Sequence, residues 1–491
     1  QDIALEVQEL LKLYAAHPQV TALDTLLKND TSRNIFLKGL NGSGPVMTIA
    51  SLFTKGRGSY VCVLNDQEEA GYFYHDLMQL TASNEVYFFP SAYRRAIKDG
   101  HVDPANEILR TEVLSRLQDP DASFVIVTYP DALAERVVAR EVLKENTLKI
   151  SVGEKLDNMF VSDVLDEYGF EQVDYVYEPG QYALRGSILD VFSFSYEFPY
   201  RIDFFGDEVE TIRTFDVETQ LSKEKLDSIY IVPEMSKNAK DSTSLLGSLP
   251  RNTFIAARDL AWCKERIGSV WNDDPVVADE ESFADIDQMR KKLVRGEDFL
   301  REVLDFRRIH FGARPMGTAD ATIHFSTQTQ PIYHKNFDRV SESFHKYLDE
   351  GYTLYILSDQ EKQANRIRMI FEDRGDNIPF TAVNRTIHEG FADDTLRICF
   401  FTDHQLFDRF HKFNLKSDKA RSGKITLSLK ELNQFSQGDY IVHIDHGVGQ
   451  FGGLVRTEVN GKMQEAIRLI YQNNDIIFVS IHSLHKLSKY K

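Results

Sequence analysis

A glycine-rich loop between an apolar stretch and an expected helix has the spacing of a chemical motif. Gly39, Gly42 and Gly44 follow the pattern of a phosphate loop, G-x-x-x-x-G-K-[ST]. That chemistry needs a lysine for the phosphate oxygens and a hydroxyl for magnesium, but Pro45 and Val46 stand at these positions. Proline also lacks the backbone N–H that would contact phosphate. We therefore expect a degenerate phosphate loop, a tight turn into a helix, and no enzymatic activity in this chain.

An arginine in an otherwise apolar and hydroxylic strand is the second candidate. Residues 178–192 read as strands and turns, with Arg185 directly before Gly186. The glycine suggests a bulge or a close backbone approach. Two roles are open for Arg185: contact with a partner, or a salt bridge across the strands.

A second arginine follows in the next strand of this stretch. Arg201 lies between two acidic residues, Glu197 and Asp203. We expect a structural role for Arg201, with its guanidinium reaching a carboxylate such as one of these two.

The residue types that bind metals give no ordered pattern. His443 and His446 are three apart, and on one strand that spacing would place them on opposite faces. The acidic cluster of residues 273–281 lacks the spacing of a calcium loop. Cys62, Cys263 and Cys399 are scattered, which indicates reduced cysteines and no disulfide framework. We assign no metal site and no cofactor.

Length and charge restrict the class of protein. A chain of 491 residues should form several domains, roughly three to five at ordinary domain size. Its formal net charge of −18 argues against a strong DNA binder, because phosphate neutralisation needs a basic surface. The sequence contains no apolar run of about 18 residues and no signal peptide, so we expect a cytoplasmic protein without a membrane span, and a monomer.

The order of expected elements predicts an α/β multidomain protein. Apolar β-branched runs at residues 35–37, 60–64, 86–89 and 124–128 alternate with amphipathic helices, which is typical of a parallel sheet. Residues 178–212 read as a small antiparallel sheet inserted into this domain. A further α/β domain follows, and then about five short strands in some 50 residues, which suggests a small β-barrel.

Two stretches carry a resemblance to a known family. Residues 179–192 read Pro-Gly-Gln-Tyr-Ala-Leu-Arg-Gly-Ser-Ile-Leu-Asp-Val-Phe, and residues 199–208 read Pro-Tyr-Arg-Ile-Asp-Phe-Phe-Gly-Asp-Glu. Residues 438–449 read Gly-Asp-Tyr-Ile-Val-His-Ile-Asp-His-Gly-Val-Gly. Together they resemble the bacterial transcription-repair coupling factors (Mfd). The first stretches resemble the part of that family that is similar to the B subunit of the excision nuclease, and the last resembles its RNA-polymerase-interacting domain, shared with CarD-type regulators.

The resemblance implies two sets of binding residues. In the family, the inserted domain docks the A subunit of the excision nuclease, and the matching positions here are Arg185, Gly186 and Phe192. Glu171 stands where relatives carry a basic contact residue. The C-terminal barrel adds a strand edge to the β subunit of RNA polymerase, and the matching strand here is Val455, Arg456, Thr457, Glu458 and Val459.

The resemblance also implies a division of the chain. Residues 1–134 would begin a degenerate helicase-like α/β domain, residues 135–212 would form the A-subunit-binding α+β domain, and residues 213–330 would complete the first domain. Residues 331–430 would form an α/β scaffold domain with a basic linker, and residues 431–491 would form the RNA-polymerase-interacting barrel.

The function implied is that of an adaptor in transcription-coupled DNA repair. The chain would be the non-catalytic front half of a coupling factor, linking stalled RNA polymerase to nucleotide-excision repair. In the full family an ATP- and magnesium-dependent DNA translocase motor follows, a helicase-type hydrolase through which DNA would chiefly be bound. Two alternatives are a nucleotide-dependent helicase-like enzyme, which Pro45 argues against, and a free-standing CarD-like transcription regulator.

Overall fold

The computed structural model describes residues 4–29, 31–93, 103–235, 241–273, 282–409, 411, 432, 434–459 and 462–490. The basic connector expected at residues 415–430, the tip of the hairpin at 460–461 and most of the acidic cluster at 273–281 lie outside these residues. The chain divides into two compact units: unit 1 comprises residues 1–106, 116–139 and 239–415, and unit 2 comprises residues 107–115, 140–238 and 416–491. No helix among the described residues is long and apolar enough to cross a membrane.

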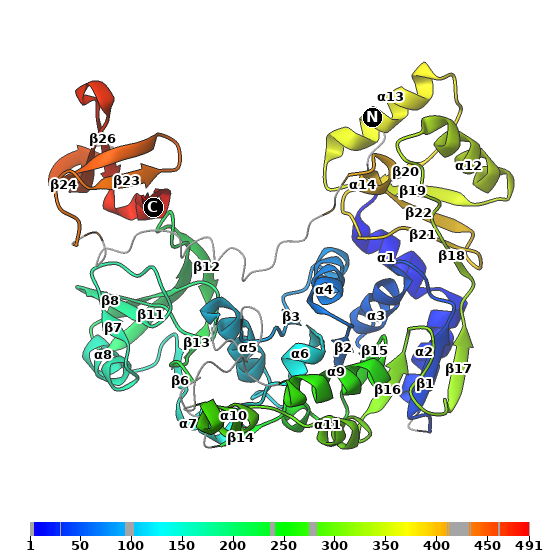
Figure 1. Cartoon of the computed structure of the whole chain (residues 1–491), viewed down its shortest axis with the longest axis horizontal. Coiled ribbons are helices and arrows are strands. Elements are labelled where there is room, and N and C mark those ends of the chain that lie inside the picture. Colours follow the sequence, from blue (N-terminus) through cyan, green and yellow to red (C-terminus); the bar gives the residue numbers. More distant parts are fainter. Residues whose placement is uncertain are drawn as a thin grey trace. The chain divides into compact units, whose positions relative to one another are not determined.

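Unit 1 is built on a seven-stranded parallel sheet in the order β17-β1-β16-β15-β2-β4-β3 (Figure 1). The strands are β1 (Asn34–Lys38), β2 (Tyr60–Val63), β3 (Val86–Phe88), β4 (Val125–Thr128), β15 (Phe254–Ala257), β16 (Arg307–His310) and β17 (Ala321–His324). The side chains of β2, β4 and β15 are buried on both faces, which explains their uninterrupted apolar sequences. The predicted parallel α/β domain is therefore confirmed.

Helices cover this sheet in two groups that pack among themselves. The first group comprises α1 (Val7–Ala15), α2 (Pro18–Lys28), α3 (Gly44–Thr54) and α4 (Gln67–Thr81). The second comprises α6 (Pro130–Leu133), α9 (Leu260–Asn272) and α11 (Gly296–Val303). Asp66 and Asp259 accept backbone N–H groups at the starts of α4 and α9, which fixes where these helices begin.

A second sheet in unit 1 has the order β18-β21-β22-β19-β20. Its strands are β18 (Thr327–Thr329), β19 (Thr353–Leu357), β20 (Thr381–Val383), β21 (Phe391–Asp393) and β22 (Ile398–Thr402), with helices α12 (Phe337–Asp349), α13 (Glu361–Asp373) and α14 (Asp403–Leu406). β19 pairs in parallel with β20 and β22, while β21 is antiparallel to β22 and β18. This is the further α/β domain that the sequence predicts.

Acid should destabilise unit 1 through His310 on β16. The side chain is fully buried beside Asn34, and its Nδ1 has no hydrogen-bond partner. Burial, with the charge of Arg308, lowers the pKa of His310 from 6.5 to about 4. The unfolded chain binds a proton at His310 more readily than the folded chain does. The stability that the neutral, buried His310 contributes is therefore complete above about pH 6.5 and is lost as the pH falls towards 4. We expect a loss of about 2 kcal/mol between pH 7 and pH 5.

The matched variant is His310→Gln, which keeps a polar side chain beside Asn34 but cannot titrate. Hydrogen exchange of the β1 and β16 amides at the two pH values measures the opening free energy locally. Between pH 7 and pH 5, the opening free energy of the variant should fall by about 2 kcal/mol less than that of the wild type. An equal loss in both proteins would show that His310 does not carry the effect.

In unit 2, residues 171–226 form a six-stranded sheet in the order β12-β11-β10-β9-β8-β7. The strands are β7 (Glu171–Gln172), β8 (Gln181–Arg185), β9 (Ile188–Val191), β10 (Tyr200–Phe205), β11 (Glu208–Phe215) and β12 (Ser222–Leu226). One face packs on α8 (Asn158–Glu167) and on the pair β6 (Leu148–Ser151) and β13 (Ser228–Ile231). These strands carry the small α+β fold to residue 231, past residue 212 where the sequence analysis ends the domain.

Gly186 is neither in a bulge nor at a close backbone approach, so that expectation was wrong. It lies in the two-residue turn that joins β8 to β9, with φ of 61°. A Cβ atom there would meet nothing within 4 Å. The glycine is needed for its left-handed backbone in a tight hairpin, where other residues are strained.

The C-terminal part of unit 2 is a five-stranded antiparallel sheet in the order β26-β25-β24-β23-β27. Its strands are β23 (Tyr440–His443), β24 (Gly447–Val459), β25 (Lys462–Ile470), β26 (Ile476–Ser480) and β27 (Leu487–Lys489). A core of nine buried apolar residues lies against it, including Ile441, Phe451 and Ile467. The five short strands agree with the sequence analysis.

Candidate functional sites

The loop at residues 39–45 joins β1 to α3 and borders a cavity of about 490 Å³. The groups of this loop that could bind phosphate already bond within the protein. The Ser43 N–H donates to the Glu389 carbonyl (3.2 Å), and the Asn41 N–H donates to the Thr327 hydroxyl (2.9 Å). The Ser43 hydroxyl donates to Asp76 Oδ2 at 3.3 Å.

Charge also disfavours a polyphosphate in this cavity. Its lining includes one guanidinium, that of Arg258, which pairs with Glu69. It also includes five carboxylates, those of Asp66, Glu68, Glu69, Asp76 and Glu389. Burial raises the pKa of both Asp76 and Glu69. No lysine lines the described cavity, and Pro45 lies at the N-terminal end of α3 where the motif lysine would stand.

The second site is the sheet face of unit 2 that carries Arg185. Residues paired directly across an antiparallel sheet point to the same face. The register places Ala183, Asp190, Arg201, Arg213 and Lys225 in one row across β8 to β12. Arg185 is two residues from Ala183 on β8 and therefore lies on this face too. We call Arg185, Arg201, Arg213 and Lys225 the cationic face.

Asp190 organises the cationic face. Its carboxylate is fully buried and accepts from Arg185 Nη2 (2.6 Å), Arg201 Nε (2.8 Å) and Arg201 Nη2 (3.0 Å). Arg185 also donates to the Asp174 carbonyl at 2.9 Å and lies 5.0 Å from the Tyr175 ring centroid. Its side chain remains 36% exposed, so part of the positioned guanidinium faces solvent. Both open roles are compatible with this arrangement: a cross-strand salt bridge holds an arginine that a partner can still reach.

Arg201 reaches a carboxylate, as expected, and that carboxylate belongs to Asp190. Its guanidinium binds Asp190 on the neighbouring strand, whereas Asp203 pairs with Arg213 at 3.2 Å. The reason is geometric: Asp190 lies directly opposite Arg201 in the register, and both point to the same face.

The other predicted docking residues lie at different places in the same sheet. Phe192 is 6% exposed and packs with Val176, Ala183 and Phe215, so it supports the cationic face from within. Glu171 is exposed on the edge strand β7, which pairs with the start of β8. The structure thus places Arg185 at the end of β8, Gly186 in the turn to β9 and Phe192 just after β9, and leaves Glu171 on the edge strand.

The third site is the second half of β24. β23 pairs with residues 447–450 of β24, and β25 pairs with residues 450–459. A shift in register between Phe451 and Leu454 redirects the strand, and Gly453 there has φ of +95°. Among the described residues, no strand pairs with the other edge of residues 454–459. All five predicted polymerase-binding residues, Val455 to Val459, lie on this unpaired edge.

The sequence analysis considered His443 and His446 on one strand, and only that part of the expectation was wrong. His443 ends β23 and His446 lies in the following turn, so strand periodicity does not apply to the pair. Their ring centroids are 4.6 Å apart. The Asp445 N–H donates to His443 Nδ1 at 3.0 Å, which gives this histidine a structural contact in the turn.

Three histidines of unit 1 that the sequence analysis did not single out also lie together: His388, His404 and His411. They are separated by 16 and 7 positions in the sequence, so no short motif could have revealed them.

Two family models match parts of this chain. Residues 148–236 match the model of the UvrB interaction domain, and residues 435–491 match that of the CarD-like/TRCF RID domain. The first match contains the cationic face, and the second contains the unpaired edge of β24.

Curated relatives cover nearly the whole chain. A transcription-repair-coupling factor of Staphylococcus aureus (strain USA300) is 23% identical over 557 aligned positions, covering 96% of this chain and 47% of the relative. The corresponding protein of Bacillus subtilis (strain 168) is 23% identical over 533 positions, covering 92% of this chain and 45% of the relative. The chain spans about half the length of the curated relatives it matches. With its two domain matches, it is similar to the amino-terminal half of the transcription-repair coupling factors, as the sequence motifs predicted.

Proposed function

We propose that this chain is the non-catalytic adaptor part of a transcription-repair coupling factor, acting in the cytoplasm. The cationic face would dock the A subunit of the excision nuclease. The β24 edge would bind the β subunit of RNA polymerase. Residues 39–45 would be a degenerate phosphate loop, and the C-terminal sheet would be a small barrel. ATP, magnesium and most DNA binding would belong to the motor that the family carries.

The observation that carries the proposal is that one chain presents two different binding surfaces within its two domain matches. The cationic face holds four cations around Asp190 and Asp203. This is a local positive surface on a chain whose net charge is −18, so it favours an acidic partner surface. The β24 edge offers unpaired backbone groups, which favour a partner that adds a strand.

The test measures binding of the purified chain to each partner separately by biolayer interferometry. Arg185→Ala should weaken binding to the excision-nuclease A subunit by roughly tenfold to a hundredfold, the usual range for a central arginine. Binding to the polymerase β subunit should not change. Thr457→Arg should weaken binding to the polymerase β subunit, because a long charged side chain on an edge blocks strand addition, and should leave binding to the A subunit unchanged.

Two controls separate docking from folding. Arg251→Ala removes an exposed arginine (65%) of unit 1, and Ile476→Arg places the same new charge on β26, at the far end of the sheet. Arg251→Ala should leave binding to the A subunit unchanged, and Ile476→Arg should leave binding to the polymerase β subunit unchanged. If the wild-type chain binds neither partner, the adaptor function is wrong, and binding of nucleotide or DNA becomes the next hypothesis to test.

A further inference from the structure

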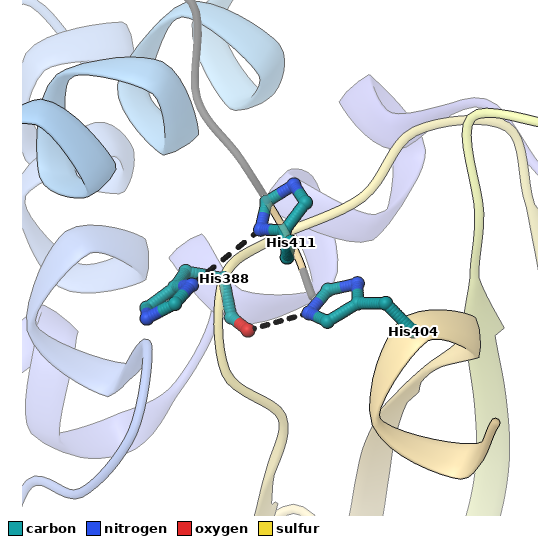
Figure 2. Close-up of side chains that lie close together, drawn as sticks. All are labelled: His388, His404 and His411. Atoms are coloured by element: carbon teal, nitrogen blue, oxygen red, sulfur yellow. Dashed lines mark hydrogen bonds between the residues drawn. The ribbon is translucent and has the colours of Figure 1, made fainter. Parts of the chain in front are cut away.

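His388, His404 and His411 come from three separate parts of unit 1. His388 lies in the loop between β20 and β21, His404 lies in α14, and His411 lies just beyond that helix (Figure 2). One ring nitrogen of each lies within 4.8 Å of the others. Figure 2 shows the three rings converging on one small region from the loop, the helix and the segment that follows it.

The distance between the first two ring nitrogens fits a tetrahedral metal. His388 Nδ1 and His411 Nδ1 are 3.4 Å apart. Two nitrogens that each lie about 2.0–2.1 Å from a tetrahedral zinc ion are separated by roughly 3.3–3.4 Å. The third ring is also close, because His404 Nε2 lies 2.8 Å from the carbonyl oxygen of His388.

The surrounding side chains fix the histidines in place. Tyr72 on α4 stacks on His388 with ring centroids 3.5 Å apart, and its hydroxyl donates to the His411 carbonyl at 2.6 Å. The backbone N–H of His388 donates to the buried Asp76 carboxylate at 3.0 Å. The stacking contact holds the His388 ring, and the two hydrogen bonds hold the backbone of His388 and His411, so surrounding groups position both residues.

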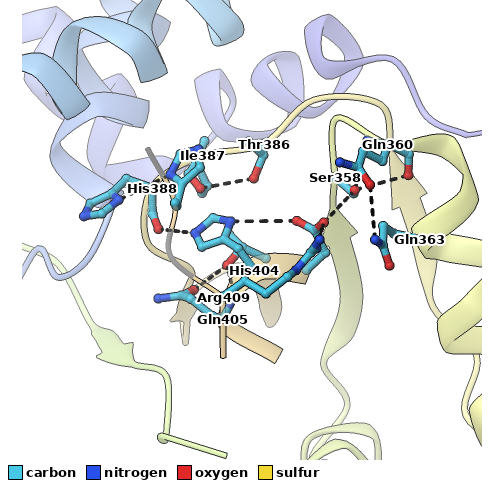
Figure 3. Close-up of polar contacts among 12 residues, drawn as sticks. Ser358, Gln360, Gln363, Thr386, Ile387, His388, His404, Gln405 and Arg409 are labelled. Carbon is cyan, nitrogen blue, oxygen red and sulfur yellow. Dashed lines mark hydrogen bonds and ion pairs between the residues drawn. The ribbon is translucent and has the colours of Figure 1, made fainter. Parts of the chain in front are cut away.

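A carboxylate also lies behind the third histidine. His404 Nδ1 is 3.7 Å from Asp403 Oδ1, and the other oxygen of Asp403 accepts from Arg409 (2.8 Å) and Ser358 (2.9 Å). Figure 3 labels His404, Arg409 and Ser358 in this group of polar contacts. A carboxylate behind one ring nitrogen favours the tautomer in which the other nitrogen can bind a metal. Asp76 and Asp403 would both offset the charge of a bound cation.

We propose that His388, His404 and His411 form a binding site for a divalent transition metal, with zinc as the expected ion. His388 and His411 would bind through Nδ1. His404 would bind through Nε2, whose contact with the His388 carbonyl oxygen would be replaced by the bond to the metal. Nitrogen ligands favour zinc over magnesium or calcium. The site goes beyond the adaptor function, and its role would be structural: it would join the segment after α14 to the loop before β21.

The experiment uses the full chain without a histidine tag, stripped with a chelator and then dialysed against zinc and against metal-free buffer. Elemental analysis should find about one zinc per chain. Substitution with Co²⁺ should give the visible absorption of a tetrahedral nitrogen site. His404→Gln and His411→Gln should each weaken Co²⁺ binding by roughly a hundredfold, more than the loss of a second-layer contact.

His324→Gln, an exposed histidine of β17, is the matched control and should bind Co²⁺ like the wild type. Circular dichroism of the metal-free proteins shows whether the variants fold. The proposal is overturned if the wild-type chain holds no zinc and gives no Co²⁺ spectrum, or if folded His404→Gln and His411→Gln variants bind as tightly as the control. Should one variant not fold, the other variant and the wild-type spectrum decide the question.

Discussion

Replacing Asp190 by alanine should lower the opening free energy of the docking sheet by about 3–5 kcal/mol, the usual effect of removing one partner of a buried ion pair. Asp190 is fully buried and accepts three hydrogen bonds from Arg185 and Arg201. Without it, two guanidinium groups would face each other on one sheet face with no carboxylate between them. Hydrogen exchange of the β9 and β10 amides, followed by mass spectrometry on the whole chain, measures the change.

Asp203→Ala is the matched control for this variant. Asp203 pairs with Arg213 on the same face, but both side chains are partly exposed, at 26% and 31%. Water screens such a pair, so its loss should cost less than about 1 kcal/mol. If the two variants destabilise β9 and β10 equally, Asp190 does not organise the cationic face as described.

Replacing Gly39 by alanine should destabilise unit 1 by about 2–4 kcal/mol, the sum of backbone strain and a steric clash. Gly39 has φ of +91°, and an added Cβ would lie 2.2 Å from the Phe325 carbonyl oxygen. That oxygen belongs to backbone, so it cannot move aside as a flexible side chain could. Urea unfolding and exchange of the β1 and β17 amides should both report the loss.

Gly56→Ala distinguishes strain from clash. Gly56 also has positive φ (+77°), but a Cβ there would meet nothing within 4 Å. This variant should be destabilised only by the strain of an alanine at positive φ, which costs about 1–2 kcal/mol. If Gly39→Ala destabilises the protein no more than Gly56→Ala does, the clash with the Phe325 carbonyl oxygen is easily relieved.

The sequence predicted the elements of this chain well where one face or both faces of an element are buried. The apolar runs at β2 and β4 and the stripes of α1 and α4 left few alternatives, because burial dictates residue type there. The order of the strands in the seven-stranded sheet was beyond such reasoning. β15, β16 and β17 return after residue 250 to lie beside β1 and β2, and only long-range pairing determines that.

The candidate sites show where prediction from sequence stops. Arg201 binds Asp190 because β9 and β10 pair with these two residues directly opposite each other, and their spacing in the sequence does not reveal that register. Val455 to Val459 could be identified as a strand, but its unpaired edge depends on how far β23 extends. His388, His404 and His411 meet where the loop before β21, α14 and the position after it come together beside Tyr72 of α4, which no local pattern encodes.

The loop at residues 39–45 has a mechanical consequence. Gly39 lies against the backbone of Phe325, Gly42 lies against that of Gly390, and the Ser43 N–H bonds to Glu389. In a nucleotide-driven motor, such a loop must change conformation when nucleotide binds and when it is released. Here backbone contacts hold the loop on two sides, at Phe325 just after β17 of the first sheet and at Glu389 and Gly390 just before β21 of the second sheet. Load applied to one sheet of unit 1 would therefore pass to the other through this loop.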